Sequence, residues 1–404
     1  MKRTTGVLVM LPLLGSAQAL AGSNIEVMTQ NQYFGADITP LGTAGDDADA
    51  FNDALVTILE QIADSSFPER AQRQAKQIAR HRPHLVGLQE VWVLDCWDTD
   101  DQDDKGCEDP SIAGAFNEQL DVTLAALDAV GARYVSVAQV TNFNVPKLLF
   151  NINGFDATLS ITDRDVILAK EGLSAAAVTN LCAAPQSGGG CNYQAFVQVP
   201  VPVPPPGSVV NLTRGFIAVD ATVHGKDYRF VNTHLEVRQP DPTNPASRFF
   251  QSAQAAELIG TLAATTPADR SLIVVGDINS SPEDQPIPGP LPLPPPFNAG
   301  LVPPYQQFVA AGYVDVWDAQ PGNRPGFTCC QDPDLLNRRS LLDERIDMIF
   351  SWDEPGRVTA RVVGDKVSDK TFPPGLGLWP SDHAGVWASL QFVNWAGAQV
   401  SWNR

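Results

Sequence analysis

Polar residues stand directly after several apolar segments, where the strands of a folded sheet would carry them to one edge. Glu90, His234 and Asp277 each follow such a segment, and the segments read as buried strands. Functional groups at strand ends gather at one mouth of a packed sheet structure. Further polar residues occupy similar positions at strand ends: Asn31, Asn279, Asp347, Asp382 and His383. We therefore expect one site that combines carboxylates, amides and imidazoles.

The carboxylates and amides of this set suit a hard metal ion. The oxygen ligands on offer are the carboxylates of Glu90 and of Asp277 or Asp382, and the amides of Asn31 and Asn279. Oxygen donors favour Mg²⁺ or Mn²⁺ and suit zinc poorly. The sequence therefore predicts a Mg²⁺ site, with Mn²⁺ as the alternative ion.

The two histidines add proton chemistry to the predicted metal site. His234 and His383 can carry a proton or donate to developing negative charge. The sequence holds no nucleophile elbow around a serine and no Gly-rich phosphate loop. A hard cation with histidines, and without those motifs, indicates metal-assisted hydrolysis of a phosphoester by water.

The segments that must position these residues alternate between strand-like and helix-like patterns. Helices are expected over residues 50–62, 69–80, 117–130 and 248–263. Strands are expected over residues 24–31, 84–89, 134–139, 165–169, 216–223, 228–233, 271–275, 345–351 and 384–392. Strands that are apolar on both faces imply two packed sheets with helices outside. The expected fold is α/β (α+β), a four-layer sandwich of two packed mixed β-sheets flanked by helices.

Three segments are expected to be loop insertions, near residues 95–110, 182–212 and 284–305. The first is acidic, the second alternates Val and Pro in part, and the third is Pro-rich. Proline-rich sequence does not form a regular strand or helix. None of the insertions is long enough to separate two domains, so residues 22–404 are expected to form a single domain.

The N-terminal residues have the pattern of a secretory signal peptide. Lys2 and Arg3 precede an apolar run over residues 6–14, and small residues suited to cleavage follow. We expect residues 1–21 to be removed and the protein to be secreted or periplasmic. No later segment approaches ~18 uninterrupted apolar residues, so no transmembrane helix is expected.

Six cysteines in an exported chain suggest disulfide bonds. Their close spacing favours local pairing. The expected pairs are Cys96–Cys107 and Cys182–Cys191, with Cys329 and Cys330 either bonded to each other or free.

The charge of the 404-residue chain is strongly negative. Lys and Arg number 27 against 46 Asp and Glu, which gives a net charge of −19. Such a surface repels polyphosphate backbones unless a basic groove or a metal compensates. The composition therefore disfavours a non-specific nucleic-acid binder but leaves a metal-dependent nuclease open.

Six short blocks, taken in order, resemble the endonuclease/exonuclease/phosphatase superfamily, which has the fold of deoxyribonuclease I. The resemblance covers residues 24–395. The blocks are Asn31, Leu88-Gln89-Glu90-Val91, Asn232-Thr233-His234-Leu235, Gly276-Asp277-Ile278-Asn279, Arg345-Ile346-Asp347 and Ser381-Asp382-His383. The resemblance implies the same sandwich fold and a metal-dependent phosphoesterase.

The resemblance also implies a role for each matched residue. On the metal side it points to Glu90 as principal ligand, Asp382 as a second carboxylate, and Asn31 as the residue that orients the ligand or the phosphate. On the catalytic side it points to His234 as donor to a phosphate oxygen, Asp277 and Asn279 as the pair that positions or activates water, and His383 as acid/base with Asp347 as its partner. It further implies Arg214 as a phosphate contact and Asp165 as a partner of His234. Asp277 and His383 both stay open as the group that takes the proton of water.

The substrate is not fixed by these residues. A nuclease, a sphingomyelinase-like phospholipase and a phosphomonoesterase all fit the resemblance. The acidic charge and the export signal favour a lipid headgroup or a small phosphodiester, with an extracellular nuclease acting on nucleic acid as the alternative. A non-catalytic binding module on the same fold is a further alternative, and no obligate protein partner is indicated.

Overall fold

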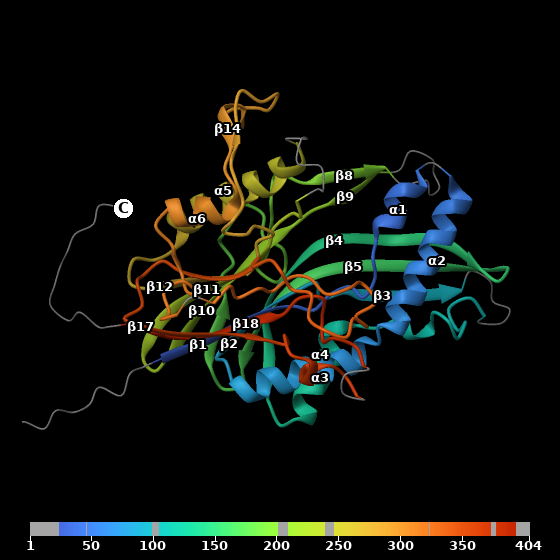
Figure 1. The fold of residues 1–404 in the computed structure, drawn as a ribbon, viewed down its shortest axis with the longest axis horizontal. Helices are drawn as coiled ribbons and strands as arrows, with labels where there is room; N and C mark the ends of the chain where they lie inside the picture. Colours follow the sequence, from blue (N-terminus) through green and yellow to red (C-terminus); the bar gives the residue numbers. More distant parts are fainter. Residues whose placement is uncertain are drawn as a thin grey trace, which may run out of the picture.

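The computed structural model describes residues 24–45, 47–98, 105–200, 209–238, 246–322, 324–372 and 377–392. The expected signal peptide, residues 1–21, lies outside these ranges. The described residues form two large mixed sheets that pack face to face (Figure 1). None of the helices in these ranges is both long and apolar enough to cross a membrane.

The first sheet has the strand order β17-β18-β1-β2-β5-β3, with β4 paired to the other side of β5. Strands β1 and β2 are parallel, and β18 pairs antiparallel with β1. Its strands are β1 (Asn24–Asn31), β2 (Leu85–Gln89), β3 (Val93–Asp98), β4 (Tyr134–Ile152), β5 (Phe155–Lys170), β17 (Arg357–Val363) and β18 (Gly385–Gln391).

The second sheet has the order β15-β16-β12-β11-β10-β6, with β7 also paired to β10. Strands β11 and β12 are parallel, and β16 runs antiparallel to β12. Its strands are β6 (Ser174–Ala177), β7 (Cys191–Asn192), β10 (Gly215–Val223), β11 (Lys226–His234), β12 (Ser271–Asp277), β15 (Val314–Asp315) and β16 (Asp347–Ser351).

Helices cover the outer face of each sheet. Apolar residues of α3 and α4 pack on the first sheet, and those of α5 and α6 pack on the second. Figure 1 shows the two helix pairs on opposite sides of the molecule. The helices are α1 (Thr39–Ala44), α2 (Ala48–Asp64), α3 (Phe67–His81), α4 (Gln119–Ala129), α5 (Ala246–Thr265) and α6 (Pro304–Ala310), with 3₁₀ turns η1 (Ala113–Ala115), η2 (Phe297–Ala299) and η3 (Val367–Asp369). The predicted four-layer sandwich is confirmed.

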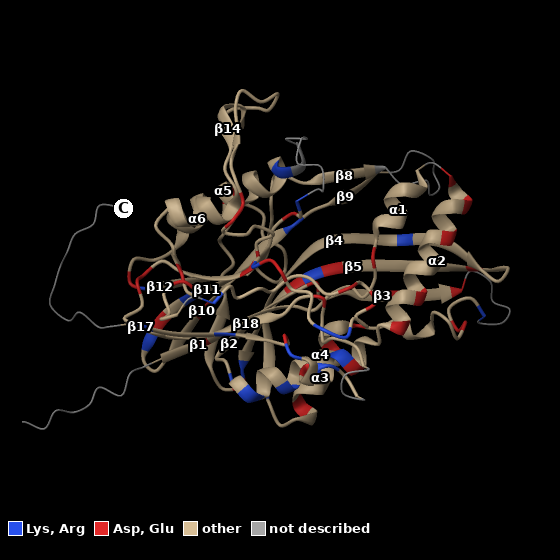
Figure 2. Cartoon of the chain, viewed as in Figure 1, with Lys and Arg blue, Asp and Glu red and all other residues tan. Residues whose placement is uncertain are grey.

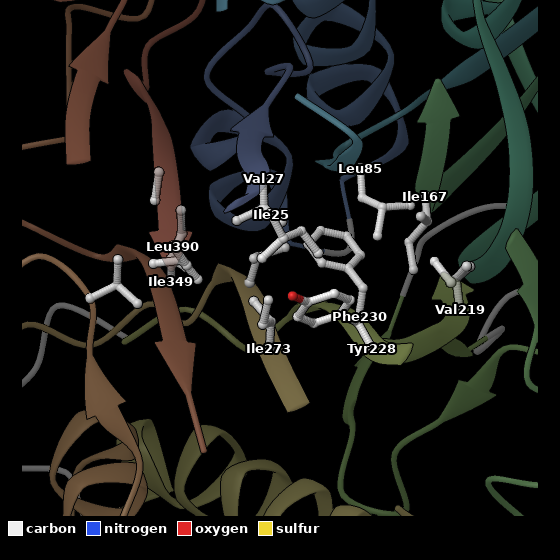
Figure 3. Packing of buried hydrophobic residues seen from close by; sticks show 14 of the residues in the cluster. Ile25, Val27, Leu85, Ile167, Val219, Tyr228, Phe230, Ile273, Ile349 and Leu390 are labelled. Atoms are coloured by element: carbon white, nitrogen blue, oxygen red, sulfur yellow. The ribbon is translucent and has the colours of Figure 1, made fainter. Parts of the chain in front are cut away.

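The core between the sheets is built from side chains that alternate along the strands. Val27 and Leu85 of the first sheet face Phe230 and Ile273 of the second, and all four are fully buried (Figure 3). At about 25 cal/mol per Å² of apolar surface, each such side chain contributes roughly 1.5–3 kcal/mol when it is buried. This apolar layer holds the two sheets, and therefore their polar ends, in a fixed relation.

The strands β4 and β5 are much longer than the residues 134–139 and 165–169 expected from sequence. They run beyond the sandwich toward α1 and α2 (Figure 1). There Leu148 and Phe150 of β4 pack against Leu55 and Leu59 of α2. The outer half of β4 exposes Asn144, Lys147 and Asn151 and contains a proline, which weakened its strand pattern, whereas the outer half of β5 alternates apolar with polar residues and is mostly buried.

The three expected loop insertions contain short strands. Residues 95–98 belong to β3, β8 (Val197–Pro200) pairs with β9 (Val209–Leu212), and β13 (Ile287–Pro288) pairs with β14 (Gly300–Leu301). The expectation of loop structure was therefore wrong at these residues, since an isolated two-stranded ribbon needs no apolar alternation. The structure bonds Cys96 to Cys107, Cys182 to Cys191 and Cys329 to Cys330.

Candidate functional site

The strand pairing brings the predicted residues to one end of the sandwich. In the first sheet Asn31 ends β1 beside Gln89, the residue before Glu90. In the second sheet His234 and Asp277 are register partners at the ends of β11 and β12, and Asp277 also pairs with Asp347. The site thus draws on the ends of both sheets, as the sequence predicts.

Gly276 allows the second sheet to place Asp277. Its φ angle is +150°, and a Cβ atom there would lie 1.9 Å from the carbonyl oxygen of Thr233. A side chain at this position would push β12 away from β11. Glycine is therefore required for the close register of Asp277 beside His234.

Asp277 lies at the centre of the site. Its Oδ2 lies 3.2 Å from Nδ2 of Asn31, 3.5 Å from Nε2 of His234 and 3.8 Å from Nε2 of His383. Its other oxygen accepts the backbone N–H of Asn279 at 2.9 Å, which fixes the carboxylate plane. The structure therefore joins the two sheets' functional groups through one carboxylate oxygen.

His383 and Asp347 form a buried pair. Nδ1 of His383 lies 2.8 Å from Oδ2 of Asp347, and the backbone N–H of Asp347 donates to Oγ1 of Thr328 at 3.1 Å. The hydroxyl of Ser381 accepts the N–H of His383 at 3.1 Å. These contacts leave Nε2 of His383 facing Asp277, so the ring is oriented into the site.

Arg214 contacts His234 at Nδ1, the ring nitrogen that lies away from Asp277. Nη1 of Arg214 lies 3.1 Å from Nδ1 of His234. A guanidinium only donates, so Nδ1 accepts from it and the ring turns Nε2 toward Asp277. Nδ2 of Asn279 lies 3.2 Å from the same Nε2 and donates to the carbonyl of Leu235 at 2.9 Å.

The expected pairing of Asp165 with His234 is not found among the described residues. Both carboxylate oxygens of Asp165 are buried without a hydrogen-bond partner. Asp163, two residues earlier on the same face of β5, instead lies 3.7 Å from Arg214, which contacts His234. The sequence alternation placed the right face of β5 at the site but could not choose between the two aspartates.

Glu90 projects from a strained turn after β2. Its φ angle is 54°, which is rare for a residue with a side chain and marks a position held by its surroundings. Oε1 accepts from Nδ2 of Asn31 at 3.1 Å, and Oε2 accepts from the N–H of Phe34 at 2.9 Å. Asn31 therefore orients Glu90 and Asp277 together through one amide group.

Burial and the crowding of carboxylates shift the protonation of the site. Burial raises the pKa of Asp277 to about 7 and that of Asp382 to about 6. The negative charge of Glu90 adds to both rises. The positive charge of His383 opposes both rises but does not cancel them, and a bound cation would relieve the remaining repulsion among the carboxylates.

The pKa values of His234 and His383 shift in opposite directions. Burial and the nearby Arg214 hold the pKa of His234 well below its usual value, so this ring is neutral. Burial also opposes the charged form of His383, but Asp347 and two further carboxylates outweigh it and hold its pKa well above the usual value. One ring is therefore a neutral hydrogen-bonding group and the other a cation.

A divalent cation fits the oxygen donors of the first sheet. Glu90 and Asp382 offer hard carboxylate oxygens, and Asn31 holds Glu90 in place. Ligand atoms of Asp277, Asp347 and His383 also lie within 4.8 Å of one another. The 2.8 Å hydrogen bond between His383 and Asp347 would compete with a cation at this second group.

Several residues that support the site were not singled out from sequence. Arg70 of α3 is fully buried and donates to the carbonyls of Gln32, Tyr33 and Pro380, which ties the loop after β1 to the loop before Asp382. Glu236 lies 3.6 Å from Arg214. These residues act through partners that are distant in the chain, so no local pattern signals them.

Comparisons with known proteins give one family match. A model of the Endonuclease/Exonuclease/phosphatase family matches residues 58–383, a range that holds every predicted site residue except Asn31. No curated protein matches the chain.

Solved structures with a similar arrangement are distant in sequence. An endonuclease/exonuclease/phosphatase family protein from Leptotrichia buccalis is 14% identical, with a TM-score of 0.47 over 91% of this chain and 100% of that one. A mannosyl-6-phosphatase from Bacteroides thetaiotaomicron is 15% identical, with a TM-score of 0.47 over 91% and 100%. Truncated TDP2 from Caenorhabditis elegans is 15% identical, with a TM-score of 0.43 over 91% and 97%.

The family match covers well over half of the chain and includes the blocks that meet at the ends of the two sheets. The protein therefore belongs to the endonuclease/exonuclease/phosphatase family, whose members hydrolyse phosphoesters.

Proposed function

We propose that the protein is a Mg²⁺-dependent phosphodiesterase that hydrolyses a lipid headgroup or another small phosphodiester by in-line attack of water. The observation that carries this proposal is the convergence of Asn31, His234 and His383 on one oxygen of Asp277. A decayed, non-catalytic site would have no reason to keep these groups in mutual contact.

The chain's own residues divide the work at the phosphoryl group. A cation held by Glu90 and Asp382 would neutralise charge on the phosphoryl oxygens. Asp277, whose Oδ2 faces both histidines, is placed to orient the attacking water and accept its proton.

The histidines and Arg214 stabilise the negative charge that develops on the phosphoryl oxygens. His383 is oriented by Asp347 and presents an N–H at Nε2. His234 turns Nε2 toward Asp277, because Arg214 occupies the other ring nitrogen. Fixed donors of this kind lower the barrier because they need no reorganisation as charge builds.

An apolar hollow supports a substrate with an apolar part over a nucleic acid. It measures about 680 Å³ and is lined by Phe249 and Phe250 of α5 and by Phe297. The next residue of α5, Gln251, donates to the carbonyl of Asn279 at 3.2 Å, so the helix borders both the hollow and the site. Lipid chains bind apolar surface, whereas the net charge of −19 opposes a polyanionic duplex.

Export to the cell exterior or the periplasm is part of the proposal. Its support is the basic and then apolar pattern of residues 1–21 together with disulfide bonds among all six cysteines. Disulfides persist in oxidising compartments and are rare in the cytosol. Fractionation of cells that express the full chain, with N-terminal sequencing of the product, tests this part: an uncleaved cytosolic product contradicts it.

A substrate panel tests the activity. The purified mature protein is incubated with Mg²⁺ and sphingomyelin, phosphatidylcholine, plasmid DNA, RNA or a simple aryl phosphodiester, and the Asp277→Asn variant serves as the control. We expect release of the phosphorylated headgroup from one of the lipids or hydrolysis of the aryl diester. Faster cleavage of DNA or RNA would replace the lipid proposal with the extracellular nuclease.

A further inference from the structure

A second hollow lies at the edge of the first sheet, outside the residues of the candidate active site. It measures about 490 Å³ and lies between the end of α3, the end of β17 and the segment that precedes Thr328. Four cationic side chains line it against two carboxylates: Arg80, Arg324, Arg361 and Lys366 face Asp365 and Asp369. In a chain with a net charge of −19, this is an unusual concentration of positive charge.

The cations of this hollow outnumber its carboxylates by four to two. Within the part of the chain that the structure describes, none of the four forms an ion pair with a carboxylate. Oδ2 of Asp369 accepts the backbone N–H of Lys366 at 3.1 Å. Figure 2 shows basic positions on α3 and β17, the two elements that carry Arg80 and Arg361.

An unsatisfied amide lies in the same wall. Both Nε2 and Oε1 of Gln77, which lines the hollow, are buried without a hydrogen-bond partner. Buried polar atoms are almost always paired, so an orphaned amide points to a group that is missing from the protein chain itself. Gly364 leaves room beside it, since a Cβ there would lie 3.1 Å from Nε2 of Gln77.

Several cations of the hollow lie close enough to His81 to lower the pKa of its ring. His81 also lines the hollow, and burial lowers its pKa, with Arg80, Arg361 and Lys366 lowering it further. Three cations from a helix, a strand and a loop therefore raise the potential at a common point. Guanidinium groups match a tetrahedral oxyanion because their paired N–H groups reach two of its oxygens.

We propose that this hollow is a binding site for a phosphate group, separate from the catalytic centre. The phosphate is either the free ion or the monoester of a small organic molecule, whose apolar part would rest on the half-exposed ring of Phe327. Phe327 directly precedes Thr328, whose hydroxyl accepts the N–H of Asp347. The site therefore lies along the chain segment that supports the catalytic histidine pair.

Calorimetric titration with inorganic phosphate in the presence of a chelator tests this proposal. The titration uses the Glu90→Gln protein, so that neither metal binding nor turnover contributes. We expect Arg361→Gln and Arg80→Gln to weaken phosphate binding about tenfold each, because each removes one charge-assisted contact. Arg357→Gln is the matched control, since Arg357 is exposed on the same strand but does not line the hollow.

Equal phosphate affinity in the parent and in Arg361→Gln would overturn the proposal, and so would an equal loss in Arg357→Gln. We expect chloride at matched ionic strength not to displace phosphate from the hollow. Displacement by chloride would mean that the hollow attracts any anion and is not a specific phosphate site. A parallel titration with phenyl phosphate distinguishes the source. If phenyl phosphate binds more tightly than inorganic phosphate, and Phe327→Ala removes this difference, the natural ligand is an organic monoester. If the two bind equally, the ligand is the free ion.

The test is independent of the proposed phosphodiesterase activity. Arg214→Gln, a change in the catalytic centre, should leave binding at this hollow in place. If the substrate panel fails while phosphate binding depends on Arg361, the proposed function is wrong and the phosphate site stands. If the substrate panel succeeds while phosphate binding does not depend on Arg361, the phosphate site is wrong and the proposed function stands.

Discussion

Nδ1 of His383 lies 2.8 Å from Oδ2 of Asp347, although the two residues belong to different sheets. His383 precedes β18 of the first sheet, and Asp347 begins β16 of the second. The hydrogen bond therefore spans the interface of the sandwich at its functional end. A carboxylate in this position fixes the ring and favours its protonated form.

The two residues should act as one unit. We expect His383→Ala to lower the rate of hydrolysis at least ~10²-fold, because a donor to the phosphoryl group is lost. Adding Asp347→Ala to it should cost much less than the two single effects combined. Initial rates of the two single variants and the double variant, with circular dichroism as the folding control, give the coupling. Fully additive losses would mean that the residues act separately.

Glu90 should determine metal affinity. Glu90→Gln keeps the shape of the side chain but removes the charge that a divalent cation needs, so Mn²⁺ binding measured by calorimetry should weaken about 10–100-fold. Glu171→Gln is the control, because Glu171 is exposed and pairs with Arg133 at the surface. Unchanged Mn²⁺ affinity in the Glu90 variant would move the metal to another set of ligands.

Asp165 should destabilise the fold at neutral pH. Burial and the neighbouring Asp163 raise the pKa of Asp165 well above its usual value, so the folded state binds this proton more tightly than the unfolded chain. The stability that follows is complete below about pH 4, the pKa of an unfolded aspartate, and is lost as pH rises toward the folded pKa.

The neutral amide of Asp165→Asn should remove this loss. We expect the variant to be more stable than the parent at pH 7 and to show no gain at pH 4. Urea unfolding at the two pH values measures the difference. A variant that is less stable than the parent at pH 7 would show that the ionised carboxylate has a stabilising partner.

Arg70 should hold the loop that follows Asn31 and the loop that leads to Asp382. Arg70→Met leaves the carbonyls of Gln32, Tyr33 and Pro380 without their donor in a buried setting. We expect a loss of about 3 kcal/mol in the free energy of unfolding, measured by urea titration. Lys76→Met, an exposed change on the same helix, should alter stability by less than about 0.5 kcal/mol. Similar stability of the two variants would contradict this role.

The sequence predicted the central strands well, because buried strands appear as short segments that are rich in apolar residues. Strand β1 covers the expected residues 24–31, and β12 begins at the expected Ser271 and ends at Asp277. Where such a run stops, the next polar residue lies at the sheet edge. This logic identified Glu90, His234 and Asp277 from sequence.

The parts of the fold and of the site that the sequence did not predict depend on contacts between distant parts of the chain. The outer half of β4 is half-exposed and holds Pro146 and Lys147, so its pattern resembles that of a loop. Arg70 reads as one more polar residue of an amphipathic helix, yet it donates to Pro380, which lies 310 residues further along the chain. The choice between Asp163 and Asp165 likewise depends on where Arg214 lies.

Hydrolysis of bis(nitrophenyl) phosphate by the purified mature protein tests the metal-dependent phosphoesterase most directly. Nitrophenolate release is followed with excess chelator and again after addition of Mg²⁺, for the parent and for Asp277→Asn. We predict that the chelator abolishes release, that Mg²⁺ restores it, and that Asp277→Asn lowers the restored rate at least ~10²-fold. Full activity in excess chelator, or an equal rate in Asp277→Asn, would contradict the assignment of this site.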